Sequence, residues 1–139
     1  MTAFPMVSLR EITITSQARC QWIDITADVE SALGKCGVKS GICCVASLHT
    51  TAGITINENA DPDVGRDFFH ALEKIVPARG GYLHGEGNSD SHVKASLVGL
   101  SVHVPVKDGR LVLGTWQSVY FCEFDGPRRR KVAVTMMGE

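Results

Sequence analysis

The sequence predicts a single α+β domain, in which a largely antiparallel β-sheet is covered by two or three helices. Three observations carry this prediction. Strand-like alternation dominates both ends of the chain, helical periodicity is confined to its middle, and no low-complexity linker or internal repeat divides residues 1–139. A chain of 139 residues also has the length of one domain, and such a domain buries roughly 65–70% of its unfolded surface.

Strands are predicted where apolar and polar residues alternate or where β-branched residues cluster. In chain order the segments are 8–14, 21–25, 41–48, 54–57, 101–106, 110–113, 115–124 and 131–136. The run 41–48 is apolar throughout, which is typical of a strand buried on both faces. Asp108-Gly109 predicts a tight hairpin, and the last two segments are expected to pair with each other.

Three helices are expected between these strands. Thr26 is a candidate N-cap of the first, whose apolar face is followed by Gly37. Asp61 and Pro62 begin the second, which Pro77 ends. The third is shorter, from about residue 91 to 98, with Ser89 and Asp90 as its candidate caps. So few helices cannot cover both faces of the sheet, so we expect a partner subunit to cover one face.

Composition and charge exclude several classes of protein. The net charge is −1, whereas a general nucleic-acid or membrane-surface binder carries a basic excess. No apolar run approaches the ~20 residues that span a bilayer. The first residues show no basic flank followed by an apolar stretch, so a cytoplasmic location is expected. The five cysteines lack any CxxC spacing and are expected to be reduced.

Three of the five histidines lie among polar residues that a core would not select. His49 ends an apolar run in SLHTT, beside the hydroxyl of Thr50, and His84 and His92 flank the loop sequence GEGNSDS, which contains Glu86 and Asn88. Imidazoles with nearby carboxylates and amides suit zinc or another borderline divalent ion. The alternatives are a hydrogen-bonded turn for His49 and a solvated loop for His84 and His92. His70 and His103 are expected on polar surfaces.

Two further segments can bind polar or anionic groups. In NENADPD, Asp61 is expected to cap the following helix and Asp63 to interact favourably with its dipole. This leaves Asn57 and Glu58 as the functional pair. The arginines at positions 128, 129 and 130 suit phosphate recognition, although a charged turn is also typical of a solvated strand edge. Lys94 follows His92 closely and is expected near an anion at the start of the third helix.

Taken together, these segments resemble the YjbQ family, the secondary thiamine-phosphate synthase family. The resemblance rests on HTTAGITINENADPDV (49–64), HGEGNSDSHVKASLVG (84–99) and the stretch from Asp108 that contains GTWQ and GPRRR. It implies a mixed sheet, a homotrimer whose sheets pack around a threefold axis, and a histidine-rich cleft. The residues carried over are His49, Asn57, Glu58, His84, Glu86, Asn88, His92 and an arginine of the GPRRR turn.

The function expected from this resemblance is a small cytoplasmic enzyme that acts on phosphorylated small molecules. In the implied reaction, a thiazole phosphate displaces pyrophosphate from hydroxymethylpyrimidine diphosphate, forming thiamine monophosphate weakly. The cofactor is expected to be zinc, or magnesium if the chemistry is that of phosphate. The expected catalytic residues are His49, Glu58 and His92, the metal ligands His49, His84 and His92, and the anion-binding residues Thr50, Asn57, Asn88, Lys94, Arg128, Arg129 and Arg130. Whether His49 and His92 move protons or ligate metal stays open. The alternative is a trimeric metal- or metabolite-binding protein without catalysis.

Overall fold

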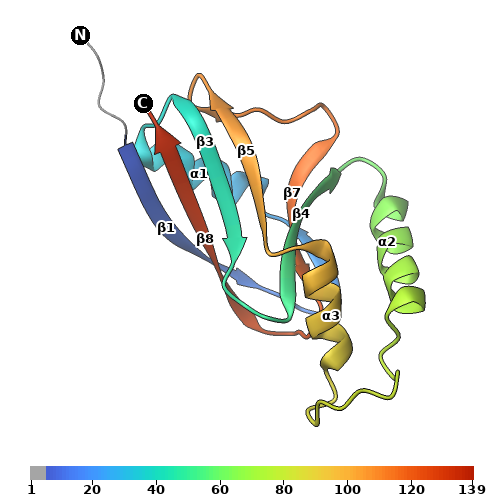
Figure 1. The fold of residues 1–139 in the computed structure, drawn as a ribbon. Helices are drawn as coiled ribbons and strands as arrows, with labels where there is room; N and C mark the ends of the chain where they lie inside the picture. The colour runs from blue at the N-terminus through green and yellow to red at the C-terminus, as the bar shows by residue number, and fades with distance from the viewer. Residues whose placement is uncertain (1–5) are drawn as a thin grey trace.

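The computed structural model describes residues 6–139, which fold into two antiparallel sheets and three helices (Figure 1). The larger sheet has the order β1 (Met6–Thr15), β8 (Arg129–Gly138), β3 (Ser40–Ser47), β5 (Ser101–Lys107) and β6 (Arg110–Leu111). The smaller sheet has the order β2 (Gln21–Asp24), β7 (Gln117–Glu123) and β4 (Ala52–Glu58). The helices are α1 (Thr26–Cys36), α2 (Pro62–Ile75) and α3 (Ser89–Val98). The predicted α+β class and single domain are confirmed.

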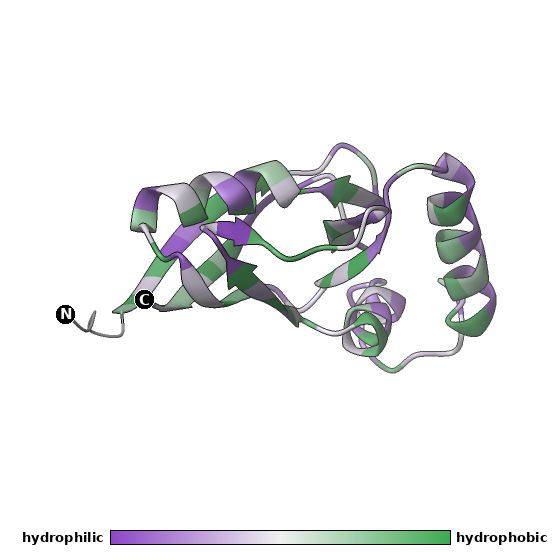
Figure 2. Ribbon diagram, turned by 90° about the horizontal axis from the view of Figure 1, so that it is seen from above, coloured by the Kyte–Doolittle hydropathy of each residue, from purple (hydrophilic) through white to green (hydrophobic). Residues whose placement is uncertain are grey.

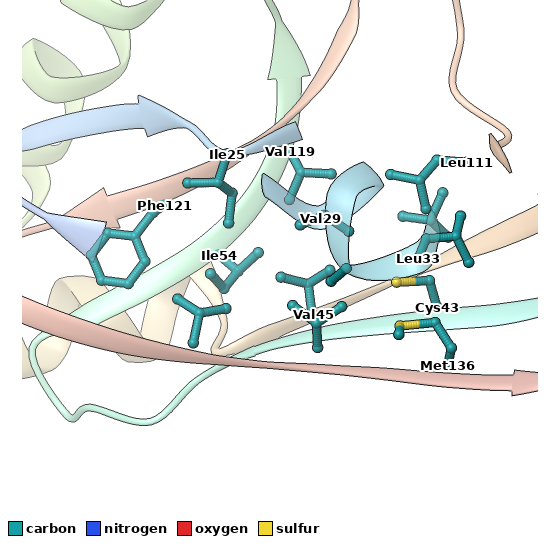
Figure 3. Packing of buried hydrophobic residues seen from close by; sticks show 14 of the residues in the cluster. Ile25, Val29, Leu33, Cys43, Val45, Ile54, Leu111, Val119, Phe121 and Met136 are labelled. Atoms are coloured by element: carbon teal, nitrogen blue, oxygen red, sulfur yellow. The ribbon is translucent and has the colours of Figure 1, made fainter. Parts of the chain in front are cut away.

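The main core lies between the inner face of the larger sheet, helix α1 and the smaller sheet (Figure 3). Val45 and Val134 come from the larger sheet, Leu33 from α1, and Phe121 from the smaller sheet, and each is almost fully buried. Burying one such side chain stabilises the fold by about 1.5–3 kcal/mol. Because β7 contributes Phe121 and its alternate neighbours to this core, its opposite face is left for a second one.

A second, aromatic core joins that opposite face to α2 and α3. The indole of Trp22 stacks between Tyr120, at a centroid distance of 4.3 Å, and Phe68, at 5.2 Å. Phe69 meets the edge of Phe124 at 6.0 Å. Helix α2 stands at the side of the molecule in Figures 1 and 2. Its aromatic side chains therefore provide much of its attachment to the smaller sheet.

The outer face of the larger sheet carries apolar side chains that nothing in residues 6–139 covers. Val7 and Leu9 of β1 are 69% and 64% exposed, and Ile42 of β3 and Met137 of β8 are 45% and 47% exposed. The strand register places Met137 between Val7 and Ile42, so these three side chains form a row across three strands. Helix α1 lies on the opposite side of this sheet (Figure 2). One face of the larger sheet is therefore uncovered in the protomer, as the small number of helices predicted.

Three strand-level expectations need correction. Strand β3 is buried on one face only: Cys43 and Val45 are buried, whereas Ile42 lies on the open outer face. Strands β7 and β8 do not pair with each other, because they belong to different sheets. Every pairing among the described strands is antiparallel, so the mixed sheet implied by the family resemblance is not found there. The Asp108-Gly109 hairpin is confirmed, with both residues at positive φ.

The predicted caps were right for one helix and wrong for two. Asp61 accepts a hydrogen bond from Asp63 N–H at 2.9 Å, and Pro62 opens α2. Thr26 does not cap α1, because its hydroxyl accepts from the N–H of Val119 in the smaller sheet. Neither candidate caps α3: the N-cap position is Asn88, and both Ser89 and Asp90 lie inside the helix. No helix in residues 6–139 is long and apolar enough to cross a membrane.

Gly65 allows α2 to lie directly on the ring of Trp22. A Cβ at this position would approach three indole atoms at 2.7–2.9 Å, so we expect Gly65→Ala to lower the free energy of unfolding by about 1–3 kcal/mol through overpacking. Chemical denaturation measures this. Gly34→Ala in α1 is the matched control, because a Cβ there meets nothing within 4 Å. The control should stabilise by about 0.5–1 kcal/mol. Equal effects of the two substitutions would contradict the close contact.

Candidate functional site

His49 is fixed in the turn between β3 and β4 by bonds at its backbone and at its ring. Its N–H donates to Ser47 Oγ at 3.2 Å, and its Nε2 accepts the backbone N–H of Lys131 at 2.8 Å. The neighbouring Leu48 N–H donates to the Lys131 carbonyl at 3.3 Å. The turn is thus attached to the start of β8. Because Nε2 is an acceptor, the proton of the neutral ring lies on Nδ1.

The surroundings of His49 favour this neutral form. Burial is the largest cause that lowers the pKa of His49 below 6.5, and the positive charges of Arg130 and Arg128 lower it further. Glu123 acts in the opposite direction but does not outweigh them. In this orientation the ring offers an Nδ1–H donor, and its Nε2 lone pair is already used. His49 is therefore not placed as a metal ligand in the protomer.

A buried ion pair lies beside His49 and joins the two sheets. Glu123, at the end of β7, is fully buried, and Arg130 of β8 is 3% exposed. Arg130 Nε donates to Glu123 Oε1 at 2.8 Å, Nη2 donates to Oε2, and Nη2 also donates to Thr51 Oγ1 at 2.8 Å. Ser16 Oγ donates to Glu123 Oε1 at 2.6 Å. We call His49, Thr51, Glu123 and Arg130 the His49 cluster.

The bonds to Glu123 keep it ionised despite its burial. Burial by itself raises the pKa of a carboxyl group, but hydrogen bonds from Arg130 and Ser16 and from the backbone of Asp125 more than compensate, so the pKa of Glu123 lies below 4.5. Both charges of the pair are then present at neutral pH. Arg130 donates its hydrogen bonds to this carboxylate and to Thr51. Its guanidinium holds the turn and does not face an external anion.

The second polar group lies around the start of α3, and we call it the Asn88 cluster (His84, Asn88, His92 and Asp125). Asn88 Nδ2 donates to Asp125 Oδ2 at 2.8 Å, and its Oδ1 is buried without a hydrogen-bond partner among the described residues. The rings of His84 and His92 meet edge to face with centroids 5.2 Å apart. His84 Nε2 lies 3.6 Å from Glu86 Oε2. The two histidines of this loop region thus come together as expected.

Arg128 connects the two clusters. Its Nη2 donates to Asp125 Oδ2 at 2.9 Å and its Nε donates to the Asp125 carbonyl at 2.8 Å, while its charge also acts on His49. Arg129 is exposed and makes no ion pair within residues 6–139. Thr50 is exposed in the turn beside His49. The 125–130 turn therefore has the His49 cluster on one side and the Asn88 cluster on the other.

The three histidines do not form one metal site in the protomer. No group of three or more His, Cys, Asp or Glu side chains in the described part of the chain is placed to hold a metal ion. His84 and His92 are in contact, but His49 lies in the other cluster with Nε2 occupied. Any metal ligation by His84 and His92 therefore needs a further donor to approach them.

Asn57 and Glu58 lie at the far end of β4 from His49. Strand β4 spans seven residues, which is about 20 Å at 3.3 Å per residue. The Oδ1 of Asn57 accepts the N–H of Glu58 at 2.8 Å. Next to them, Asn59 N–H donates to the carbonyl of Trp116 at 2.8 Å, and Trp116 is 61% exposed. The segments NEN and GTWQ are thus brought together, but away from both histidine clusters.

Lys94 is buried between helices instead of facing an anion. It is 2% exposed, and its Nζ lies 3.0 Å from Asp90 Oδ2 and 2.8 Å from Glu73 Oε2. Burial works against the ammonium, but the hydrogen bonds that it donates to these carboxylates prevail and raise the pKa of Lys94. Asp90 also binds Arg19 at 3.1 Å. The anion-binding role expected for Lys94 is therefore replaced by a structural one that joins α2 to α3.

Sequence reasoning missed Glu123 and Asp125 and gave Asp90 only a capping role, although each had a detectable signal. Glu123 interrupts the apolar run VYFCEF, and a charge inside such a strand requires a buried partner. The GPRRR turn a few residues later supplies it. Asp90 lies four residues before Lys94, which is the spacing of a helical ion pair. Asp125 follows the strand that contains Glu123, at a position where polar residues commonly mark a turn.

The model of the YjbQ family, described as "UPF0047 protein YjbQ-like", matches residues 10–139 of this chain. This chain belongs to the YjbQ family. The protein is 50% identical over 131 residues to the UPF0047 protein YugU of Bacillus subtilis, covering 94% of this chain and 99% of that one. It is 48% identical over 126 residues to a UPF0047 protein of Methanocaldococcus jannaschii, covering 91% of each.

Solved structures of YjbQ-family proteins have the same fold as this member. An uncharacterized conserved protein of the family from Clostridium acetobutylicum has a TM-score of 0.89 at 52% identity, covering 91% of this chain and 98% of that one. A protein of unknown function from Sulfolobus solfataricus has a TM-score of 0.93 at 31% identity, covering 98% of this chain and 100% of that one. The family resemblance seen in the sequence is thus confirmed, and these relatives carry no assigned activity.

Removing one partner of the buried pair should be far more costly than removing an exposed arginine. Arg130→Gln leaves the Glu123 carboxylate buried without its counter-charge, and we expect a loss of about 3–5 kcal/mol in the free energy of unfolding. Arg128→Gln breaks a half-exposed pair with Asp125 and should cost less than about 1 kcal/mol. Urea denaturation compares them. A double variant, Glu123→Leu with Arg130→Met, should recover much of the loss; similar costs for the two single variants would refute this account.

Neutral His49 should contribute stability that depends on pH. Its pKa is lowered on folding, so the unfolded chain takes up the proton first as the pH falls. The contribution is complete above pH 6.5, the ordinary value, and is lost as the pH drops from there through the folded pKa. We expect wild type to exceed His49→Ala in stability more at pH ~8 than at pH ~5.5. The exposed His70→Ala serves as a control. A difference that does not change with pH, or an NMR titration midpoint of His49 above 6.5, would contradict the prediction.

Proposed function

We propose that this YjbQ-family protein is a cytoplasmic enzyme that binds a phosphorylated small molecule together with a divalent metal ion. The binding surface would be the 125–130 turn and the two clusters on either side of it. The observation that carries the proposal is the buried Oδ1 of Asn88, which has no partner among the described residues. It lies at the N-cap of the helix whose first turns contain His92.

The orientation of the Asn88 amide is determined by its neighbour. Nδ2 donates to the Asp125 carboxylate at 2.8 Å, and a flipped amide would place two oxygens against each other. Oδ1 is therefore the free atom, and a buried acceptor without a donor costs about 1–3 kcal/mol. A ligand donor, or a metal ion held nearby, would satisfy it.

The chemistry of the neighbouring donors suits a divalent ion. His84 and His92 offer two imidazoles, Glu86 a carboxylate near His84, and Asn88 an amide oxygen. Two nitrogens with oxygens fit zinc, and magnesium is the alternative if phosphate oxygens complete the coordination. When bound, the ion would supply positive charge to a phosphate group. In the protomer the set would need the exposed segment from 83 to 87 to move closer, or a donor from another subunit.

The other side of the turn would bind the anionic end of the substrate. Arg129 has no counter-ion among residues 6–139, Arg128 is only partly neutralised by Asp125, and His49 keeps an Nδ1–H donor. Thr50 adds a hydroxyl in the same turn. Guanidinium groups bind phosphate oxygens in pairs, so Arg128 and Arg129 are the proposed anion ligands. Arg130 and Lys94 are excluded from this role because carboxylates already hold them.

The resemblance to secondary thiamine-phosphate synthase names a specific reaction within this class. The ring nitrogen of a thiazole phosphate would attack the methylene carbon of hydroxymethylpyrimidine diphosphate, and the carbon–oxygen bond to pyrophosphate would break. Arg128, Arg129 and the bound ion would stabilise the leaving pyrophosphate. His49, as a donor through Nδ1–H, would bind the same group without acting as a base.

The proposal is tested by pyrophosphate release from these two substrates, with zinc or magnesium added to pure protein. We expect His84→Ala and His92→Ala to lose metal and to lose at least about tenfold in turnover, whereas His70→Ala on the exposed face of α2 keeps both. Arg129→Gln should weaken pyrophosphate binding with intact metal content. Turnover that is absent in wild type, or unchanged in both metal variants, would refute the enzymatic function.

A second candidate is a metal- or metabolite-binding protein without catalysis. It is favoured by one observation: Nε2 of His49, which would have to be free to take up a proton, is occupied by the Lys131 amide. This candidate predicts a rise in melting temperature with pyrophosphate or zinc but no turnover. Measuring pyrophosphate release together with the melting temperature therefore separates the two functions.

We further propose that the protein assembles as a homotrimer through the outer face of the larger sheet. This face carries the row Val7, Met137 and Ile42, and large uncovered apolar patches mark protein interfaces. Leu97 of α3 and Leu48, beside His49, are also 59% and 50% exposed, so apolar surface reaches the edge of the candidate site. A neighbouring subunit would then be the means by which Asn57 and Glu58 join the same site.

Light scattering should give a mass of about 45 kDa, three times the chain mass of 15.0 kDa. Ile42→Asp places a charge in the row on the outer face, and we expect it to shift the protein toward monomer. The control Ile75→Asp alters another exposed aliphatic residue, at the end of α2 and away from the larger sheet, and should leave the mass unchanged. A wild-type monomer at micromolar concentration, or equal masses for both variants, would refute the assembly.

A further inference from the structure

A cavity of about 220 Å³ lies between α1 and β1, and its lining is separate from both histidine clusters. Four of its residues come from α1 at the spacing of one helix face: Asp28, Ser31, Ala32 and Lys35. The others are Arg10, Glu11 and Ile12 of β1. Ala32 is buried and Ile12 packs against the core, so these two residues form a small apolar floor in a lining that is mostly polar. The walls carry charges of both signs.

The direction of α1 determines how these charges are distributed. Residues just after α1 reach the end of the chain, since Lys39 N–H donates to the Glu139 carbonyl at 2.8 Å, and the adjacent Gly138 pairs with Met6 at the start of β1. Helix α1 therefore runs opposite to β1. Lys35, near the end of α1, lies toward Arg10, and Asp28 lies toward Ile12. The cavity thus has a cationic end and an acidic end.

Three of the four charged side chains that line the cavity are exposed and are not neutralised by a protein partner. Arg10, Lys35 and Asp28 make no ion pair with one another or with any other residue of the described chain. Glu11 is directed elsewhere, because its carboxylate lies 3.9 Å from Lys131 Nζ. Two cations at one end and one carboxylate at the other therefore remain available to a ligand. The Ser31 hydroxyl lies between the two ends on the helix face.

We propose that this cavity binds a small zwitterion, with its carboxylate at Arg10 and Lys35 and its ammonium at Asp28. A guanidinium binds a carboxylate through paired hydrogen bonds, and an apolar floor suits a short methylene chain. Asp28 and Lys35 are seven residues apart, about 10 Å along the helix at 1.5 Å per residue. This separation favours ω-amino acids, whose charges are several carbons apart, over α-amino acids. The inference does not depend on the proposed enzymatic function.

Isothermal titration calorimetry on the full chain tests the proposal with 6-aminohexanoate as the probe. We expect saturable binding with a Kd on the order of a millimolar. Glycine has its charges too close together, and hexanoate and hexylammonium each lack one of them. All three should bind roughly three- to fivefold more weakly, as expected for partly exposed charge pairs.

Variants locate the binding to this cavity. Arg10→Gln should remove the preference for 6-aminohexanoate over hexylammonium, and Asp28→Asn should remove the preference over hexanoate. Both side chains are exposed, so the variants should fold, as melting curves can verify. Lys39→Gln, a neighbouring exposed lysine outside the cavity, is the matched control and should bind like wild type. No saturation by 6-aminohexanoate, equal binding of hexanoate, or unchanged binding in both cavity variants would overturn the proposal.

Discussion

The pair of Glu123 and Arg130 is the interaction on which the rest of the molecule depends. Glu123 ends β7 of the smaller sheet and Arg130 begins the inward-facing positions of β8 in the larger one. The same carboxylate holds Ser16 after β1, and the same guanidinium holds Thr51 before β4. Two strand ends from each sheet therefore meet at one buried charge pair. Since neither charge can be solvated there, the geometry is tolerated only when all these bonds form together.

This junction also places the chemistry of the protein. His49 lies two residues from Thr51 and is bonded to Lys131, the residue after Arg130. Asp125 lies two residues from Glu123, and through Asn88 it positions the start of α3. His49 and Asn88 are thus attached to this buried junction, whereas His84 and Glu86 lie in the exposed loop before α3. Such support from surrounding residues is what a binding or catalytic site requires.

The sequence was sufficient to locate the helices and strands but not to predict how they assemble. Alternation and caps located the strands and α2, because these signals depend on neighbouring residues. The partition of β7 and β8 into different sheets arises from long-range pairing, of β8 with β1 and β3 and of β7 with β2 and β4, which alternation within one segment does not express. Lys94 shows that the partners of a candidate site residue also cannot be predicted from its neighbours in the sequence. Its position beside His92 suggested an anion ligand, but Glu73, on another helix, pairs with it. The histidines of one loop could be grouped correctly, whereas His49 was separated from them by the tertiary fold.

The position of β8 in the larger sheet has a consequence for synthesis on the ribosome. Strand β8 is the last strand of residues 6–139, yet it lies between β3 and β1, the first strand of that range. While the chain is being made, β1 has no neighbour and β3 can pair only with β5. The sheet, and the buried pair at its edge, form only after residues 129–138 have emerged. Contacts so distant along the chain are typical of slow folding, and until then the nascent β1 strand exposes both of its edges and its core residues Ile12 and Ile14.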